Sequence, residues 1–126
     1  MKILKCSVCG NIVEMLHDAG VPIMCCGQPM KELKAGESDG ALEKHVPAVT
    51  VENGVVSVQV GEVEHPMLAE HHIEFILVKA GSKVTRADLQ PGEKPVAQAV
   101  IGDYHGLVEV YEYCNLHGLW KKEVTI

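Results

Sequence analysis

The sequence predicts an all-β protein in which a small cysteine-rich metal module precedes an antiparallel β-sandwich. Four of the five cysteines lie before residue 27. About seven stretches rich in β-branched residues follow Val46, and turn-forming residues separate them. No stretch of the chain has a convincing helical period, so both parts are expected to consist of strands and turns.

The metal module is expected at residues 1–36 and the sandwich at residues 37–126, because the polar, glycine-bearing stretch Lys34–Gly40 is typical of a linker. A module of about 36 residues buries too little apolar surface to fold on a hydrophobic core alone, and usually needs a metal or covalent crosslink. The cysteines are the residues that would supply this crosslink.

Two cysteine pairs indicate a metal site in this module. Cys6 and Cys9 form a C-x-x-C pair, whose two-residue spacer lets both thiolates face one ion, whereas Cys25 and Cys26 are adjacent. Because adjacent side chains must bend together to reach one metal, we expect a distorted tetrahedron. Four thiolates suit either zinc or iron, so the pattern predicts a site but leaves the metal open.

The β region begins with a strong hairpin signal. Ala48–Glu52 and Val55–Val60 are separated by Asn53-Gly54, a pair that favours a type I′ turn. Further strands are expected at Ile73–Lys79, Lys83–Ala87, Val96–Ile101, Leu107–Tyr113 and Leu119–Thr125, with a loop at Leu89–Pro95. Since aromatic residues are scarce, the core must consist mainly of Val, Ile, Leu and Met.

Composition narrows the class of protein. A formal charge of −6 argues against a general nucleic-acid binder. The chain has no signal-peptide pattern and no apolar run of the roughly 18–20 residues that span a bilayer, so we expect a soluble, cytoplasmic protein without a membrane partner. Five cysteines would leave one unpaired in a disulfide framework, and in a reducing cytosol closely spaced cysteines are more often metal ligands.

A second group of candidate ligands lies where predicted strands meet loops. Its members are His45, His65, His71, Cys114 and His117. Cys114 and His117 form a C-x-x-H pair after a β run, a spacing that can place thiolate and imidazole on one ion. A lone histidine in a β protein is usually structural or exposed, and spacing alone leaves the metal-binding and structural interpretations of this group about equally supported.

These motifs resemble, in order and separation, those of the desulfoferrodoxins, which are two-iron superoxide reductases. The matching segments are Cys6-x-x-Cys9-Gly10-Asn11, Cys25-Cys26-Gly27, Glu43-Lys44-His45-Val46-Pro47, His65-Pro66-Met67, Glu70-His71 and Cys114-Asn115-Leu116-His117-Gly118. The resemblance covers essentially the whole chain. It implies a desulforedoxin-like module and an immunoglobulin-like sandwich, with iron rather than zinc at Cys6, Cys9, Cys25 and Cys26.

For the second domain the resemblance implies a catalytic iron with four equatorial imidazoles and an axial thiolate. The implied ligands are His45, His65, His71 and His117, with Cys114 as the thiolate. The chain departs from the family at position 72, which is commonly a bulky aromatic residue and here is His72. We choose His71 as the ligand because it keeps the family's five-residue gap after His65. His17, His72 and His105 are expected to be surface or packing residues.

The resemblance implies one-electron reduction of superoxide to hydrogen peroxide without release of oxygen. Five protein ligands leave one face of a ferrous ion open to a small anion. Lys44 would attract superoxide to that face, and Glu43 would occupy the sixth position after oxidation and help to displace peroxide. The family further implies a rubredoxin-like electron donor and a homodimer.

Three other functions remain open at this point. The protein could be an electron carrier that binds no small molecule, a zinc-ribbon interaction module, or a superoxide dismutase. Metal content separates the zinc protein from the others, and oxygen release separates a dismutase from a reductase.

Overall fold

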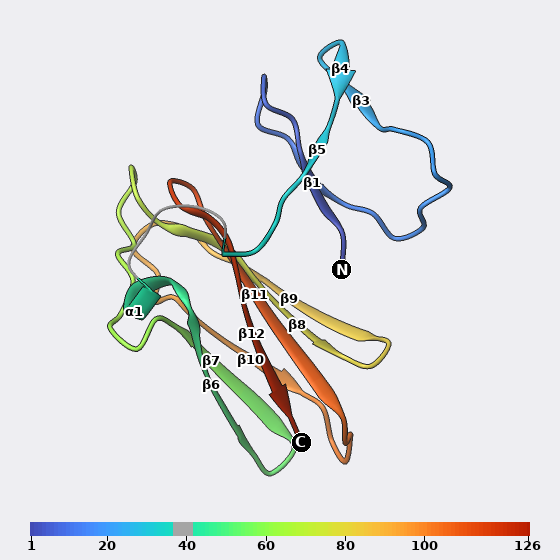
Figure 1. Ribbon diagram of the computed structural model, residues 1–126. Helices are drawn as coiled ribbons and strands as arrows, with labels where there is room; N and C mark the ends of the chain where they lie inside the picture. Colours follow the sequence, from blue (N-terminus) through green and yellow to red (C-terminus); the bar gives the residue numbers. More distant parts are fainter. Residues whose placement is uncertain (37–41) are drawn as a thin grey trace. The chain divides into compact units, whose positions relative to one another are not determined.

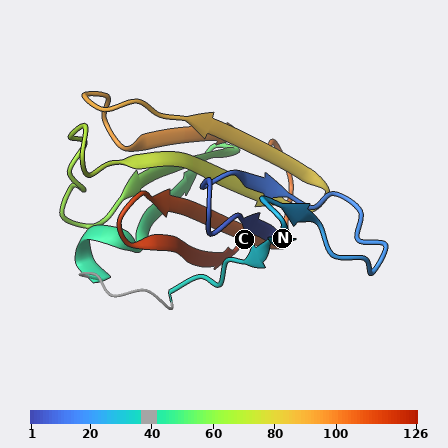
Figure 2. The same ribbon diagram turned by 90° about the horizontal axis from the view of Figure 1, so that it is seen from above.

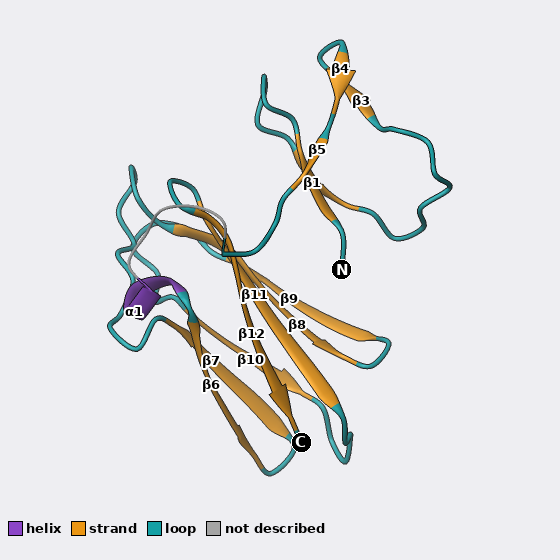
Figure 3. Ribbon diagram, viewed as in Figure 1, coloured by secondary structure: helices purple, strands orange, loops and turns teal. Residues whose placement is uncertain are grey.

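The structure is a computed structural model that describes residues 1–36 and 42–126. It divides the chain into two compact units, Met1–Lys34 and Ala35–Ile126. The predicted linker Lys34–Gly40 spans this division, and its residues 37–40 lie outside the described part of the chain. Within the described residues the protein is almost entirely strand and turn, which confirms the predicted all-β class (Figure 3).

The first unit consists of short strands that position the cysteines. Its described residues form a three-stranded antiparallel sheet in the order β2-β1-β5 and a two-stranded hairpin of β3 and β4 (Figure 1). The bounds are β1 Ile3–Lys5, β2 Ile12–Glu14, β3 Met24–Cys25, β4 Gln28–Pro29 and β5 Lys31–Glu32. Cys6 and Cys9 lie in the β1–β2 connection, and Cys25 and Cys26 lie where β3 turns into β4.

The second unit is an antiparallel sandwich. Its described strands form one sheet in the order β10-β7-β6 and another in the order β12-β11-β8-β9. The elements are α1 Leu42–His45, β6 Pro47–Glu52, β7 Val55–Val60, β8 Ile73–Ala80, β9 Lys83–Asp88, β10 Val96–Val100, β11 Leu107–Cys114 and β12 Gly118–Thr125. Two antiparallel sheets are the architecture expected of an immunoglobulin-like fold.

The core follows from the period-two pattern of the strands. In β7 the side chains of Val56, Val58 and Val60 are buried, whereas the alternate residues are only partly covered. These valines pack in one cluster with Ile, Val and Ala side chains of β8, β10 and β11. The core is therefore aliphatic, as the scarcity of aromatic residues predicted.

The β6–β7 hairpin has the predicted turn. Glu52 pairs with Val55, so Asn53 and Gly54 are the two turn residues. Their φ angles are 51° and 73°, and positive values at both positions define a type I′ turn, which matches the natural twist of paired strands. Asn and Gly are the residues that adopt this conformation at least cost.

The five remaining predicted strands are all present, and no observed end lies more than one residue from its predicted position. Leu89–Pro95 is a loop between β9 and β10, as predicted. The expectation of no helix was wrong for α1, a single turn at Leu42–His45. A helix of four residues is too short to show a 3.6-residue hydrophobic period, so no pattern in the sequence predicted it. No helix in the described residues is long and apolar enough to cross a bilayer.

One end of the sandwich gathers several connections that lie far apart in sequence. Figures 1 and 2 both show α1, the β7–β8 connection and the β11–β12 turn at the same end of the second unit. The two sheets thus present three separate segments of the chain to one place.

Candidate metal centres

Three segments of the second unit contribute one cluster of five potential ligands. His45 ends α1, His65 and His71 lie in the β7–β8 connection, Cys114 is the last residue of β11, and His117 immediately precedes β12. Each offers one ligand atom, and these atoms all lie within 4.8 Å of one another. The structure therefore brings together every ligand expected for the second domain.

The possible ligand atoms of this cluster lie close to one another. His45 Nε2 lies 3.2 Å from His65 Nε2 and 2.9 Å from His117 Nδ1, and Cys114 Sγ lies 3.8 Å from the same His117 Nδ1. The Nε2 atom of His71 is buried and has no hydrogen-bond partner among the described residues. A buried polar atom without a partner is costly, and a metal ion in the cluster would satisfy it. The donor set fits a transition metal.

Burial keeps these side chains in the form that binds a metal. It lowers the pKa of His65 to about 4, so this imidazole is neutral at neutral pH. The pKa of His71 is also lowered, first by burial and then by the charges of His117 and Lys44. Burial raises the pKa of the Cys114 thiol. A bound metal cation would have the opposite effect, because it stabilises the thiolate.

Neighbouring residues orient two of the imidazoles. His65 Nδ1 lies 2.7 Å from the carbonyl oxygen of Pro66, so the ring donates there and its Nε2 keeps a lone pair for a metal. The indole of Trp120 stacks on His45 with ring centroids 4.9 Å apart, and its Nε1 donates to the carbonyl oxygen of His117 at 3.0 Å. Trp120 thus contacts ligands from two segments of the chain.

Lys44, one of the two expected catalytic residues, is exposed next to His45, and its charge reaches the cluster because it contributes to the lowered pKa of His71. The side chain of Glu43, the other expected catalytic residue, lies outside the described part of the structure. Gly61 allows the backbone of Lys44 to approach closely. A Cβ atom on Gly61 would stand 2.7 Å from the Cα and carbonyl oxygen of Lys44, and the φ of +81° also favours glycine.

The second cluster lies in the first unit and contains the four remaining cysteines. Cys6, Cys9, Cys25 and Cys26 each offer a sulfur atom, all within 4.8 Å of one another. Cys9 Sγ lies 3.6 Å from Cys25 Sγ, and all the cysteines are free thiols rather than disulfides. Four converging thiols without disulfide bonds fit a tetrahedral metal site.

Backbone amides prepare one of these thiols for a metal. The N–H groups of Val8 and Cys9 donate to Cys6 Sγ at 3.4 and 3.5 Å, and they lower the pKa of this thiol to about 6. Hydrogen bonds with Cys9 and Cys6 raise the pKa of Cys26 to about 12, because they favour its protonated thiol. Cys26 has φ of 52°, a left-handed conformation that accompanies the adjacent pair.

The other histidines lie apart from the clusters. His17 and His105 are exposed, and His72 is half-buried, with a buried Nδ1 that has no hydrogen-bond partner in the described residues. Only His71 of the adjacent pair joins the five-residue group. Sequence reasoning did not identify Trp120 or Gly61. The only local signal for Gly61 was its place directly after a β run. The only one for Trp120 was its place three residues after the expected ligand His117.

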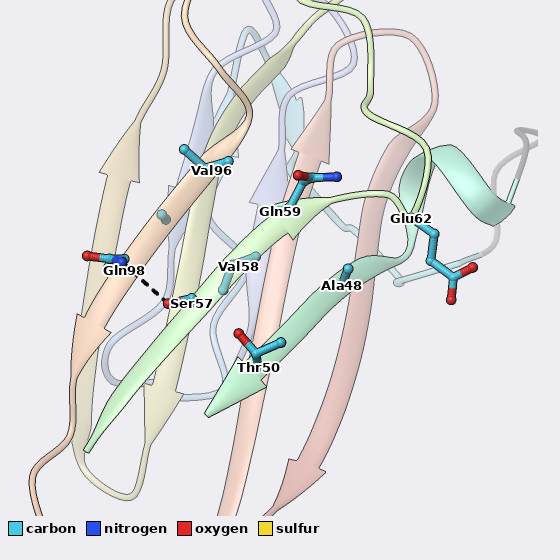
Figure 4. A pocket seen from close by; sticks show the side chains of 9 residues that line it. Ala48, Thr50, Ser57, Val58, Gln59, Glu62, Val96 and Gln98 are labelled. Atoms are coloured by element: carbon cyan, nitrogen blue, oxygen red, sulfur yellow. Dashed lines mark hydrogen bonds between the residues drawn. The ribbon is translucent and has the colours of Figure 1, made fainter. Parts of the chain in front are cut away.

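A groove on the second unit lies over a different part of the fold. It has a volume of about 700 Å³ and is lined mainly by residues of β6, β7 and β10, both apolar ones such as Val58 and polar ones such as Ser57 and Gln98 (Figure 4). Gln98 donates at 3.4 Å to Ser57, its partner on the neighbouring strand β7. No histidine or cysteine lines the groove, so the metal-binding chemistry of the described residues lies elsewhere.

Family models match both parts of the chain. The model described as desulfoferrodoxin matches residues 37–123, and the model described as desulfoferrodoxin, N-terminal domain, matches residues 1–33. Together they account for both clusters of ligands.

Individual relatives give the same result. A desulfoferrodoxin of Nitratidesulfovibrio vulgaris is 48% identical over 122 residues, which cover 97% of this chain and 95% of the relative. The crystal structure of the superoxide reductase from Treponema pallidum aligns with a TM-score of 0.75 at 32% identity, over 94% of this chain and 98% of that one. A one-iron superoxide reductase from Giardia intestinalis aligns with a TM-score of 0.58 at 30% identity, over 67% of this chain and 99% of that one.

Proposed function

Because the chain belongs to the desulfoferrodoxin family, we propose that it is a superoxide reductase with one catalytic iron site and one four-cysteine iron site. The observation that carries this proposal is the cluster of His45, His65, His71, His117 and Cys114, whose ligand atoms lie within 4.8 Å of one another. Four imidazoles and one thiolate are the donors expected at the catalytic iron, and the structure contains them in one place.

The reaction consumes one superoxide, one electron and two protons and yields one hydrogen peroxide. A ferrous ion held by the five ligands supplies the electron when it is bound. Four neutral imidazoles and a thiolate around a divalent cation leave a net charge of about +1, which favours an anionic substrate. The role of the protein residues is to keep this charge, to hold one face of the site accessible and to attract superoxide.

Lys44 is the residue that we assign to attraction. It is exposed beside the ligand His45, and its positive charge acts on His71 within the cluster. The chain carries a formal charge of −6, so a local cation is needed to favour an anion at this place. Glu43, which precedes Lys44 in α1, is assigned to the displacement of peroxide, and this role rests on the family resemblance.

The four cysteines of the first unit form the second iron site of the family. A soft donor set of four thiolates suits iron that changes oxidation state without a substrate. The relative from Giardia intestinalis is named a one-iron superoxide reductase, and it covers 67% of this chain. We therefore place reaction with superoxide at the second unit alone.

Electron supply and assembly belong to the same proposal. A small rubredoxin-like protein is the electron donor, the protein is a homodimer, and its compartment is the cytoplasm. Five free thiols, four of them in one cluster, fit a reducing compartment better than an oxidising one.

The decisive experiment measures products and metals together. Pre-reduced protein of known iron content is mixed with superoxide, and peroxide and oxygen are both quantified. We expect about one peroxide for each superoxide and no oxygen. Oxygen equal to half of the superoxide consumed would show a dismutase. Zinc in place of iron would show a structural module, and a reaction no faster than that of free iron would show an electron carrier.

A further inference from the structure

Asn115 connects the two segments of the chain that carry four of the five ligands. It lies between Cys114 and His117, in the turn from β11 to β12. Its side-chain Oδ1 accepts a hydrogen bond from the backbone N–H of His72 at 2.9 Å, and its Nδ2 donates to the carbonyl oxygen of Glu70 at 3.0 Å. Its own backbone N–H donates to the carbonyl oxygen of His72 at 3.1 Å.

The three hydrogen bonds flank His71 on both sides. Glu70 and His72 are the chain neighbours of this ligand, and both are joined to a residue more than 40 positions away in the sequence. The backbone of His71 itself bonds only within its own loop, to Leu68, at 2.9 and 3.2 Å among the described residues. The contacts of Asn115 thus position this loop relative to the loop of Cys114.

His71 depends on this support more than two other ligands do. The ring of His65 is oriented by Pro66 and the ring of His45 by Trp120. The ring of His71 lies near the rings of His45, His65 and His117, and His71 stands two residues before the first residue of β8, outside the ladder of that strand. Support from outside the cluster therefore reaches His71 through its backbone neighbours.

The two side-chain contacts of Asn115 suit an amide. Only a side chain with one acceptor and one donor satisfies the N–H of His72 and the carbonyl of Glu70 at once. An ionised aspartate would keep the acceptor but turn a carboxylate oxygen towards the Glu70 carbonyl. We propose that Asn115 is a positioning residue that holds His71 at the catalytic metal, an inference that rests on the proposed function because it takes His71 as an iron ligand.

The test is a double-mutant cycle on metal affinity in the full-length protein. Ferrous iron binding to the second unit is measured anaerobically by competition with a chelator, for the parent, Asn115→Ala, His71→Ala and the double variant. Loss of an outer partner of a ligand usually weakens metal binding by about 10–100-fold. We expect such a loss for Asn115→Ala in the parent, and less than about a twofold change in the His71→Ala background, because the ligand through which it acts is gone.

Two further variants keep the test sharp. Asn115→Asp retains the acceptor for His72 but sets a carboxylate oxygen against the carbonyl oxygen of Glu70, so it should lose affinity as well. Gln98→Ala removes an amide from the groove on the other sheet and should leave iron affinity unchanged. Absorption of the oxidised catalytic site should shift in Asn115→Ala, whereas the bands of the four-cysteine iron, which lies in the other unit, should stay unchanged and serve as an internal intensity reference.

Each outcome has a distinct meaning. Equal losses with and without His71 would show that Asn115 stabilises the turn in general, and this would overturn the inference. Unchanged affinity in Asn115→Ala would overturn it as well. Unchanged affinity in His71→Ala would instead show that His71 is not a ligand, which contradicts the proposed function itself.

Discussion

Single residues support the candidate catalytic site in different ways. His65 is held through its ring nitrogen, His45 by the stacked indole of Trp120, and His71 through its neighbours in the chain. Gly61 matters because it has no side chain: any Cβ atom there would collide with the backbone of Lys44. Small changes at these positions should therefore affect metal binding or substrate attraction rather than the core.

The charge of Lys44 should set the rate of encounter with superoxide. Lys44→Ala removes the exposed cation beside His45 and retains all five ligands. We expect the second-order rate at low salt to fall by about tenfold and its dependence on ionic strength to flatten, since local attraction is screened by salt. Pulse-generated superoxide decay at several salt concentrations measures both. Lys94→Ala, a change of equal charge in the exposed β9–β10 loop, is the control, and an unchanged rate in Lys44→Ala would refute this role.

The thiolate of Cys114 should determine the colour of the oxidised catalytic site. Cys114→Ser replaces the buried sulfur with a hydroxyl and leaves four imidazoles in the cluster. We expect the sulfur-to-iron charge-transfer absorption to disappear, while the bands of the four-cysteine iron remain. Visible spectra of the oxidised variant with measured iron content test this. Survival of the band would mean that a different sulfur binds the iron.

Among the elements, β11 links the site to the rest of its sheet. It ends at Cys114 and pairs with β8 on one side and β12 on the other. Glu109, nearer its start, forms ion pairs with Lys121 of β12 at 3.0 Å and with Lys79 of β8 at 4.0 Å. One carboxylate thus connects three neighbouring strands, with only 17% of its side chain exposed.

The pH dependence of stability should reveal this ion-pair network. The hydrogen bond with Lys121 holds the pKa of Glu109 below its usual range. Its stabilising effect is therefore complete above the usual carboxyl pKa and is lost as the pH falls through the lowered value. We expect Glu109→Gln to lower the free energy of unfolding by about 1 kcal/mol at pH 7.

Denaturant unfolding at pH 7 and pH 3 measures this difference, with the parent compared at each pH so that acid loss of metal affects both proteins. The difference should shrink at pH 3. Glu52→Gln, an exposed change on β6 without an ion pair among the described residues, should have little effect at either pH. A difference that persists in acid would show that packing rather than charge explains the loss.

At the scale of the whole molecule, the chain consists of two units with separate ligand sets. The four cysteines of one cluster all lie in Met1–Lys34, and the five residues of the other all lie in Ala35–Ile126. The second unit has its own aliphatic core and is long enough to fold around it. The two sites should therefore be separable by mutation.

Cys9→Ser should disrupt the four-cysteine iron and spare the catalytic one. A hydroxyl is a poor replacement for a thiolate on soft-ligand iron, and the first unit should loosen because metal binding and folding are coupled in small modules. We expect the chemically reduced variant to consume superoxide at close to the parent's second-order rate. The measurement requires confirmed iron in the second site. Loss of the reaction with that iron still bound would show that both sites take part.

The sequence by itself determined the features that depend on neighbouring residues. Alternating valines predicted β7, Asn53-Gly54 predicted the hairpin turn, and the close cysteine pairs predicted a metal in the first unit, all because these signals are set by local backbone geometry. The single turn α1 was missed because four residues are too few to show a helical period.

Only the tertiary structure decided how distant residues meet. His45 and His117 are 72 positions apart, and their ring nitrogens lie 2.9 Å from each other. Spacing alone did not decide whether His45 and His65 bind a metal. It also did not predict that Gly61 lies against the backbone of Lys44, or that Asn115 bonds to the chain neighbours of His71. The physical reason is that these contacts arise when two sheets pack and bring their loops to one end, so no short stretch of sequence contains them.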